Sequence, residues 1–167
     1  MKGSNYRLAK GMPYVRREYI HGAPQPKIAK YNMGNPKGDF NVLLKLVSTE
    51  KAQIRHNALE AARLAANKTI QGVGEKNYYL VLKPYPHVVL RENKMLATAG
   101  ADRLQEGMRR AFGKPVGLAA RVSNGTVIFE LYTKRENVDI ARRALKIASS
   151  KLPVKTRIDV VDLKANA

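Results

Sequence analysis

The chain has 167 residues, a length that suits one domain with one ordinary hydrophobic core. Its 31 Lys and Arg outnumber 13 Asp and Glu, which gives a formal net charge of +18. The absence of cysteine excludes disulfides, thiolate zinc sites and thiol catalysis, and fits a cytoplasmic protein. No apolar run approaches the roughly 18 residues of a membrane span, and the first residues lack the apolar core of a signal peptide.

The charge excess predicts a polyanionic partner. Nucleic acid explains it best, because each neutralised phosphate releases condensed counterions. An acidic lipid surface explains it less well, because no amphipathic helix pairs a cationic face with bulky apolar anchors. We therefore expect an RNA-binding protein with no membrane partner.

The first 38 residues are predicted to form a basic, extended arm. They contain four of the eight prolines, which disfavour helices and central strands, and a single acidic residue, Glu18. Tyrosines alternate with the cations and are available to stack on bases or to anchor the arm. A disordered basic tail is the alternative interpretation. The candidate RNA-binding residues of the arm are Lys2, Arg7, Lys10, Arg16, Arg17, Lys27, Lys30 and Lys37.

Residues 39–167 are predicted to form a single domain that begins with a buried strand at residues 40–48. A helix is expected next, with Ser48 or Thr49 as its N-cap and an end at the glycines of residues 72–74. Its predicted apolar face repeats at steps of three and four: Ile54, Ala58, Ala61 and Ala65, widened by Leu59, Ala62, Ala66 and Ile70. His56 is expected near the polar face of this helix, in contact with solvent.

Two strands are predicted at residues 77–84 and 87–92, where Pro84-Tyr85-Pro86 imposes a kink or a crossover. Residues 118–123 and 126–133 predict a hairpin across Asn124-Gly125. Thr133 and Glu136 have the spacing of a capping box for a second helix, whose apolar face is Val138, Ala141, Leu145 and Ala148. A last strand follows at residues 156–163. This order predicts an α+β fold, a two-layer sandwich of a mostly antiparallel sheet with two helices.

A long internal loop, residues 93–117, interrupts the predicted strands. Loops of this length within a compact domain are usually functional or disordered. Residues 101–112 have the composition of a short helix, provided that a partner holds it. The glycines allow tight turns or a close approach to a ribose-phosphate chain, and the cations form a second basic cluster. These loop residues are Gly100, Arg103, Gly107, Arg109, Arg110, Gly113 and Lys114, preceded by Arg91 and Lys94.

None of the patterns typical of catalysis fits. Gly113-Lys114 is followed by Pro115, where a nucleotide-binding P-loop needs Ser or Thr. Asp102 and Glu106 are four residues apart among arginines, which favours ion pairing within the loop over acid–base chemistry. No metal-ligand spacing joins the three histidines, His21, His56 and His87. We therefore expect no enzymatic activity, no metal, no cofactor and no small-molecule substrate.

Two segments resemble a known family: ALEAARLAANK at residues 58–68 and RENKMLATAGADRLQEGMRRAFGKPVGLAARV at residues 91–122. The family comprises the universal large-subunit ribosomal proteins called L-sixteen in bacteria and L-ten-e in archaea and eukaryotes. The segment PYVRREYIHGAPQPKIAKYNMG at residues 13–34 resembles the arm of the archaeal-eukaryotic branch. Eukaryotic members carry a longer C-terminal extension than this sequence shows after residues 156–163, so the resemblance implies an archaeal member.

The resemblance implies an α+β sandwich that is a structural constituent of the large ribosomal subunit. In this family the protein lies between ribosomal RNA helices near the peptidyl-transferase centre, and the loop matching residues 93–117 projects toward the acceptor end of tRNA in the peptidyl site. The implied partners are large-subunit ribosomal RNA, the tRNA acceptor end and neighbouring ribosomal proteins. A free-standing RNA-binding protein or an RNA-modifying enzyme is the alternative.

Overall fold

The computed structural model describes residues 1–94 and 112–163 and confirms the α+β class. In these residues the strands form two antiparallel sheets instead of one. The larger sheet has the order β1 (Asn32–Gly34), β4 (Tyr78–Leu82), β7 (Val127–Thr133), β2 (Val42–Ser48) and β8 (Thr156–Asp162). The smaller sheet has the order β3 (Ala52–Arg55), β6 (Lys114–Val122) and β5 (Val88–Glu92).

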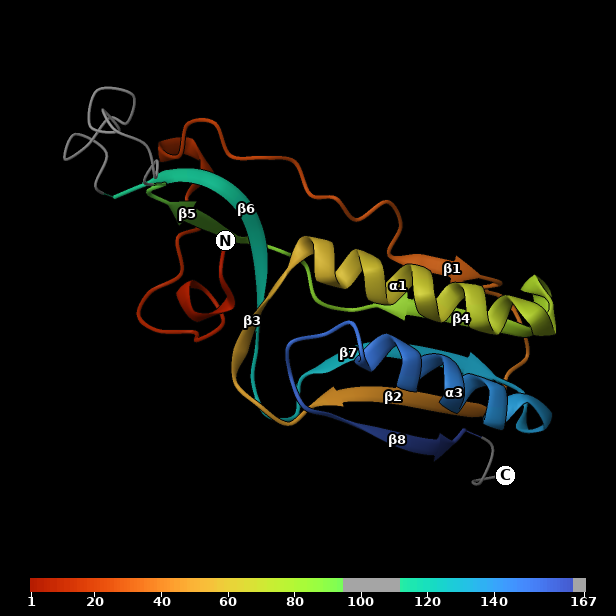
Figure 1. Cartoon of the computed structure of the whole chain (residues 1–167). Coiled ribbons are helices and arrows are strands. Elements are labelled where there is room, and N and C mark those ends of the chain that lie inside the picture. Colours follow the sequence, from red (N-terminus) through yellow and green to blue (C-terminus); the bar gives the residue numbers. More distant parts are fainter. Residues whose placement is uncertain (95–111, 164–167) are drawn as a thin grey trace.

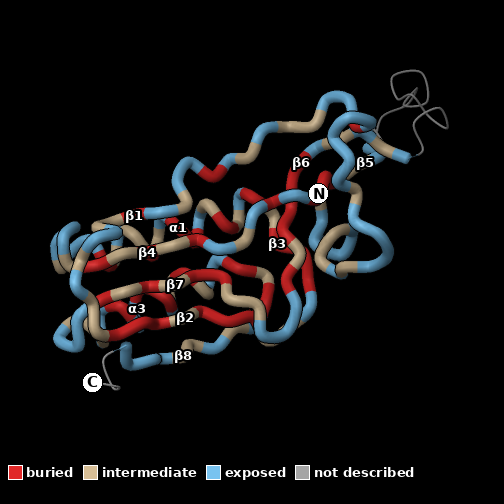
Figure 2. Tube along the Cα trace, turned by 180° about the vertical axis from the view of Figure 1, so that it is seen from behind, coloured by how far each residue is buried: buried red, intermediate tan, exposed pale blue. Residues whose placement is uncertain are grey.

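Helices α1 (His56–Ile70) and α3 (Val138–Ser149) pack against each other and cover one face of the larger sheet (Figure 1). Strand residues such as Leu44 and Phe129 and helix residues such as Leu59 and Leu145 are fully buried between these layers. The buried residues run along the strands of both sheets in the view from behind (Figure 2). Small residues of the two helices, among them Ala62 and Ala144, are also fully buried in this core.

The first helix begins later than predicted. Residues Ala52–Arg55 form strand β3, in which Ile54 is fully buried and pairs with Ala120 of β6. The Ser48 and Thr49 hydroxyls therefore cap no helix; they donate to the carbonyls of Glu50 and Lys155, respectively. The predicted N-caps are wrong, because a second buried strand lies between them and the helix.

The predicted apolar face of α1 is confirmed only in part, at the residues Leu59, Ala62, Ala66 and Ile70. Its buried residues are His56, Leu59, Ala62, Arg63, Ala66 and Ile70, whereas Ala61 is exposed. His56 is only 3% exposed, so the prediction that it contacts solvent is wrong. Ile54 lies in β3 and not in the helix, although it is four residues before Ala58. The predicted face was counted from Ile54 and therefore included Ala61, which is exposed.

The predicted hairpin across Asn124-Gly125 is wrong, although the turn itself forms. The Thr126 N–H donates to the Ser123 carbonyl across 3.1 Å. However, β6 pairs only with β3 and β5, and β7 pairs with β2 and β4, so the chain changes sheets at this turn. The predicted crossover at residues 84–86 is confirmed, because β4 and β5 lie in different sheets.

The predicted capping box is also wrong. Thr133 is the last residue of β7, and its hydroxyl donates to the carbonyl of Asn77. A 3₁₀ turn at Arg135–Asn137 precedes α3, which begins at Val138. The expected apolar face of this helix is largely confirmed, since Ala141, Leu145 and Ala148 are buried.

We expect Gly34→Ala to lower the free energy of unfolding by about 2 kcal/mol. Gly34 has φ +89°, and an added Cβ would overlap the backbone carbonyl of Tyr78 on the neighbouring strand. Urea unfolding measures the change. Gly72→Ala is the matched control, because its Cβ would meet nothing within 4 Å. Equal stability of the two variants would contradict the close approach of β1 to β4.

Candidate nucleic-acid interface

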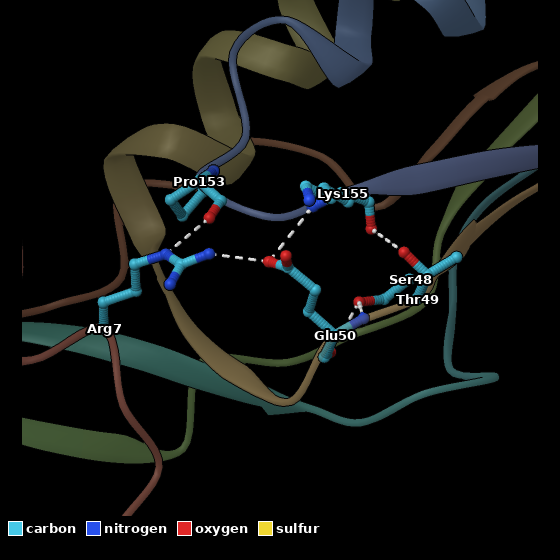
Figure 3. Close-up of polar contacts among 6 residues, drawn as sticks. All are labelled: Arg7, Ser48, Thr49, Glu50, Pro153 and Lys155. Carbon is cyan, nitrogen blue, oxygen red and sulfur yellow. Dashed lines mark hydrogen bonds and ion pairs between the residues drawn. The ribbon is translucent and has the colours of Figure 1, made fainter.

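We call residues 39–163 the body of the protein. The beginning of the arm is joined to the body by an ion pair with Glu50 (Figure 3). Arg7 Nη2 lies 2.6 Å from Glu50 Oε2, and Arg7 Nε donates to the Pro153 carbonyl across 2.8 Å. The Lys155 N–H also donates to Glu50 Oε2, across 3.4 Å. Glu50 therefore links the arm to the segment that leads into β8.

Two side chains of the smaller sheet bind the arm backbone directly. Gln53 Nε2 on β3 donates to the Tyr6 carbonyl across 2.6 Å. Arg121 on β6 donates from Nη1 to the Gly11 carbonyl at 2.8 Å and from Nη2 to the Lys10 carbonyl at 3.3 Å. Arg121 Nε also donates to Gln53 Oε1 at 3.2 Å, so the two side chains orient each other.

The middle of the arm covers the smaller sheet with apolar side chains. Ile20 is 6% exposed and forms a core cluster with Val89 of β5 and Leu118 of β6. Tyr14 packs against this cluster, and its carbonyl accepts a hydrogen bond from the Val89 N–H at 2.8 Å. Apolar burial therefore holds this segment in addition to hydrogen bonds.

The end of the arm binds α1. The Lys27 N–H donates to His56 Nδ1, and the Ala29 N–H donates to Glu60 Oε2, each across 3.4 Å. Glu60 is itself paired with Arg63, whose Nε and Nη2 lie 2.8 and 2.5 Å from its two carboxylate oxygens. The Arg63 hydrogen bond lowers the pKa of Glu60, which keeps this carboxylate charged as an acceptor for the arm.

The arm cations remain at the surface once the backbone is attached. Arg7 is half-buried in its ion pair. The other predicted arm residues are exposed: Lys2, Lys10, Arg16, Arg17, Lys27, Lys30 and Lys37. The body therefore binds the carbonyls, amides and apolar side chains of the arm and leaves most of its cations accessible to phosphates.

An aromatic cluster lies at the base of the long loop. The guanidinium of Arg91 lies 3.3 Å from the ring centre of Phe112 and 4.6 Å from that of Tyr14. Tyr14 and Phe112 also meet edge to face, with ring centres 5.5 Å apart. Arg91 therefore joins the arm to the loop base through cation–π contacts, a role that the sequence analysis did not anticipate.

The predicted C-terminal bound of the loop is wrong, because residues 114–117 belong to β6. Glu92 of β5 is the register partner of Lys114 of β6, so the segment between them begins and ends on paired strands. Gly113 has φ +90°, and a Cβ there would lie 2.9 Å from the Glu92 backbone carbon, so this site requires glycine. Lys94 and Lys114 are exposed. The remaining predicted loop residues lie outside the described residues: Gly100, Arg103, Gly107, Arg109 and Arg110. The predicted helix at residues 101–112 also lies outside them, except for Phe112.

Among residues 1–94 and 112–163, no group of three His, Asp or Glu side chains is arranged to hold a metal ion. No helix in this part of the chain has the length and apolar character needed to cross a bilayer. The residues that sequence reasoning missed are Gln53, Glu60, Arg63 and Arg121. The arm partners of Gln53, Glu60 and Arg121 are distant in sequence, 110 residues in the case of Arg121 and Gly11, so no local pattern marks these contacts. Arg63 contributes through its i, i+3 ion pair with Glu60.

We expect His56 to make stability depend on pH. Burial, with the nearby charges of Lys27 and Arg55, lowers the pKa of His56 below its usual 6.5. The unfolded chain then binds the proton more readily, so stability from neutral His56 is fully present above pH 6.5 and is lost as pH falls through the lower, folded-state pKa. His56→Gln should reduce the loss of unfolding free energy between about pH 7.5 and about pH 5.

Urea unfolding at the two pH values tests this expectation, with His21→Gln as the control at an exposed histidine of the arm. An undiminished loss of stability in His56→Gln would show that other groups cause the pH dependence.

Comparison with known proteins agrees with the predicted resemblance. The family profile described as ribosomal protein L16p/L10e matches residues 9–159. Large ribosomal subunit protein uL16 of Hyperthermus butylicus is 56% identical over 158 residues, which cover 94% of this chain and 88% of that protein. The uL16 proteins of Staphylothermus marinus (58% over 155 residues; 92% and 89% covered) and Sulfolobus acidocaldarius (53% over 168 residues; 99% and 96% covered) are similarly close. The chain therefore belongs to the ribosomal protein L16p/L10e family.

Proposed function

We propose that this chain binds large-subunit ribosomal RNA and presents residues 93–117 to the acceptor end of tRNA near the peptidyl-transferase centre. Family membership supports a structural role in the ribosome and not an enzymatic one. The observation that carries the RNA-binding part is the arm, whose backbone is bound by the body while seven of its eight predicted cations are exposed. The tRNA part rests on the family resemblance of the loop.

The mechanism is electrostatic and geometric. Exposed Lys and Arg side chains neutralise phosphates of converging RNA segments, and the rigid sandwich fixes where those cations lie. Because the arm is already ordered on the body, binding RNA requires less loss of conformational entropy than it would for a free tail. RNA is then recognised by shape and by its phosphates and 2′-hydroxyls.

Removal of two arm cations should weaken salt-dependent RNA binding. Each phosphate contact contributes roughly −0.7 to −0.9 to the slope of log K against log salt, so Arg16→Ala with Arg17→Ala should reduce the slope by about 1.5. Filter binding to a large-subunit RNA fragment across a salt series measures it. The control is Arg142→Ala with Arg143→Ala, which removes the same charge from the exposed face of α3. Equal effects of the two double variants would contradict a specific role for the arm.

Arg109→Ala with Arg110→Ala should reduce translation or association with large subunits while the melting temperature of the isolated protein stays unchanged. Arginine is rarely a core residue, so the change removes charge and little packing. Sucrose-gradient sedimentation in moderate salt and a thermal melt provide the two readouts. A large drop in melting temperature would contradict a surface-binding role for this pair.

A further inference from the structure

A groove of about 510 Å³ lies between the arm, the β4–β5 connection and the corner between β6 and β7. Its apolar lining comes from all of these parts: Pro13, Val15, Pro84, Ala120 and Val127. Its remaining lining includes Tyr85 and three basic side chains, Lys83, His87 and Arg121. No acidic residue is among the described residues that line it. A groove of this size and lining suits a planar organic group with a negatively charged substituent.

Tyr85 gives this groove a rigid aromatic wall. It is 43% exposed, and one side of its ring stacks on Tyr31, with ring centres 5.8 Å apart. The ring centres of His87 and Tyr85 lie 4.7 Å apart. The backbone N–H of His87 donates to the backbone carbonyl of Tyr85 across 3.0 Å. Pro84 and Pro86 fix the backbone on both sides of Tyr85. A ligand that stacks here would therefore find the ring already in position.

Two cations of the arm lie next in sequence to a residue that lines the groove. Arg16 and Arg17 follow the lining residue Val15 and are exposed. Arg121 is held at the groove by its bonds to the arm carbonyls of Lys10 and Gly11. Lys83 is paired with Glu130 across 3.3 Å, so its charge is partly compensated.

We propose that this groove binds one unstacked nucleotide of RNA, with the base against Tyr85 and His87 and its flanking phosphates near Arg16 and Arg17. The inference rests on the proposed RNA-binding function and adds to it a base-contacting site outside the long loop. Every base offers a π face, so aromatic platforms bind unstacked bases with little sequence preference. The absence of acids among the described lining residues, together with the exposed Arg16 and Arg17 next to Val15 in the chain, favours a nucleotide over an apolar peptide side chain.

A single-stranded RNA of about eight nucleotides with one central 2-aminopurine tests the site, because stacking on an aromatic ring quenches this base. We expect the full chain to quench it. Tyr85→Leu should abolish the quenching and weaken affinity at least about five-fold, while the salt slope stays unchanged. Tyr85→Phe, which keeps the ring, should restore the quenching. Tyr19→Leu is the control, because Tyr19 is 72% exposed on the arm and does not line the groove.

If Tyr85→Leu quenches the base as strongly as the unchanged protein, and log K still falls steeply with log salt, the proposed nucleotide site in the groove is wrong. The proposed RNA binding then stays intact. A flat salt slope with no binding would contradict both. Thermal melts show that each variant is folded.

A second measurement identifies the occupant in the assembled subunit. Val15 is replaced by the photoreactive residue p-benzoylphenylalanine, since Val15 lines the groove and is 40% exposed. Crosslinks to ribosomal RNA support the proposal. Crosslinks only to another protein would overturn it in favour of a protein partner.

Discussion

The attachment of the basic arm to the body is the interaction on which the rest of the structure depends. A segment with eight Lys and Arg and one acid would be repelled by a body that is also basic, and its four prolines disfavour helices and central strands. It is nevertheless held along its length by Glu50, Gln53, His56, Glu60 and Arg121, and by burial of Ile20, Ile28 and Met33. The arm is thus part of the folded protein and not a tail added to it.

Two of the thirteen acids, Glu50 and Glu60, hold the arm to the rest of the chain. Glu50 pairs with Arg7 of the arm, and Glu60 accepts from the Ala29 amide while Arg63 keeps it charged. Removal of one member of the Glu60–Arg63 pair would leave an uncompensated charge, because the Arg63 side chain is only 6% exposed. These two carboxylates therefore serve internal contacts, while seven of the eight arm cations stay exposed.

The sequence predicted the α+β class, most strands and both helices, because each leaves a local pattern of periodicity. It missed β3, since Ile54 has both the spacing of the helix face and a place in a buried strand. It mispaired β6 and β7, because a turn signal such as Asn124-Gly125 carries no information on which neighbours each strand has. The sequence did not predict that Gln53 and Arg121 bind the arm, because the arm carbonyls that they contact are remote in sequence.

Hydrogen exchange of the free protein tests the central claim, that the arm is ordered on the body before RNA is present. Three body amides donate to arm carbonyls across 2.8 Å each: Gln53 to Arg7, Leu82 to Tyr31 and Val89 to Tyr14. At low salt and without RNA, all three should exchange as slowly as amides within the larger sheet. If Gln53 and Val89 exchange at the rates of an unfolded chain while β2 and β7 stay protected, the arm is detached and the account is wrong.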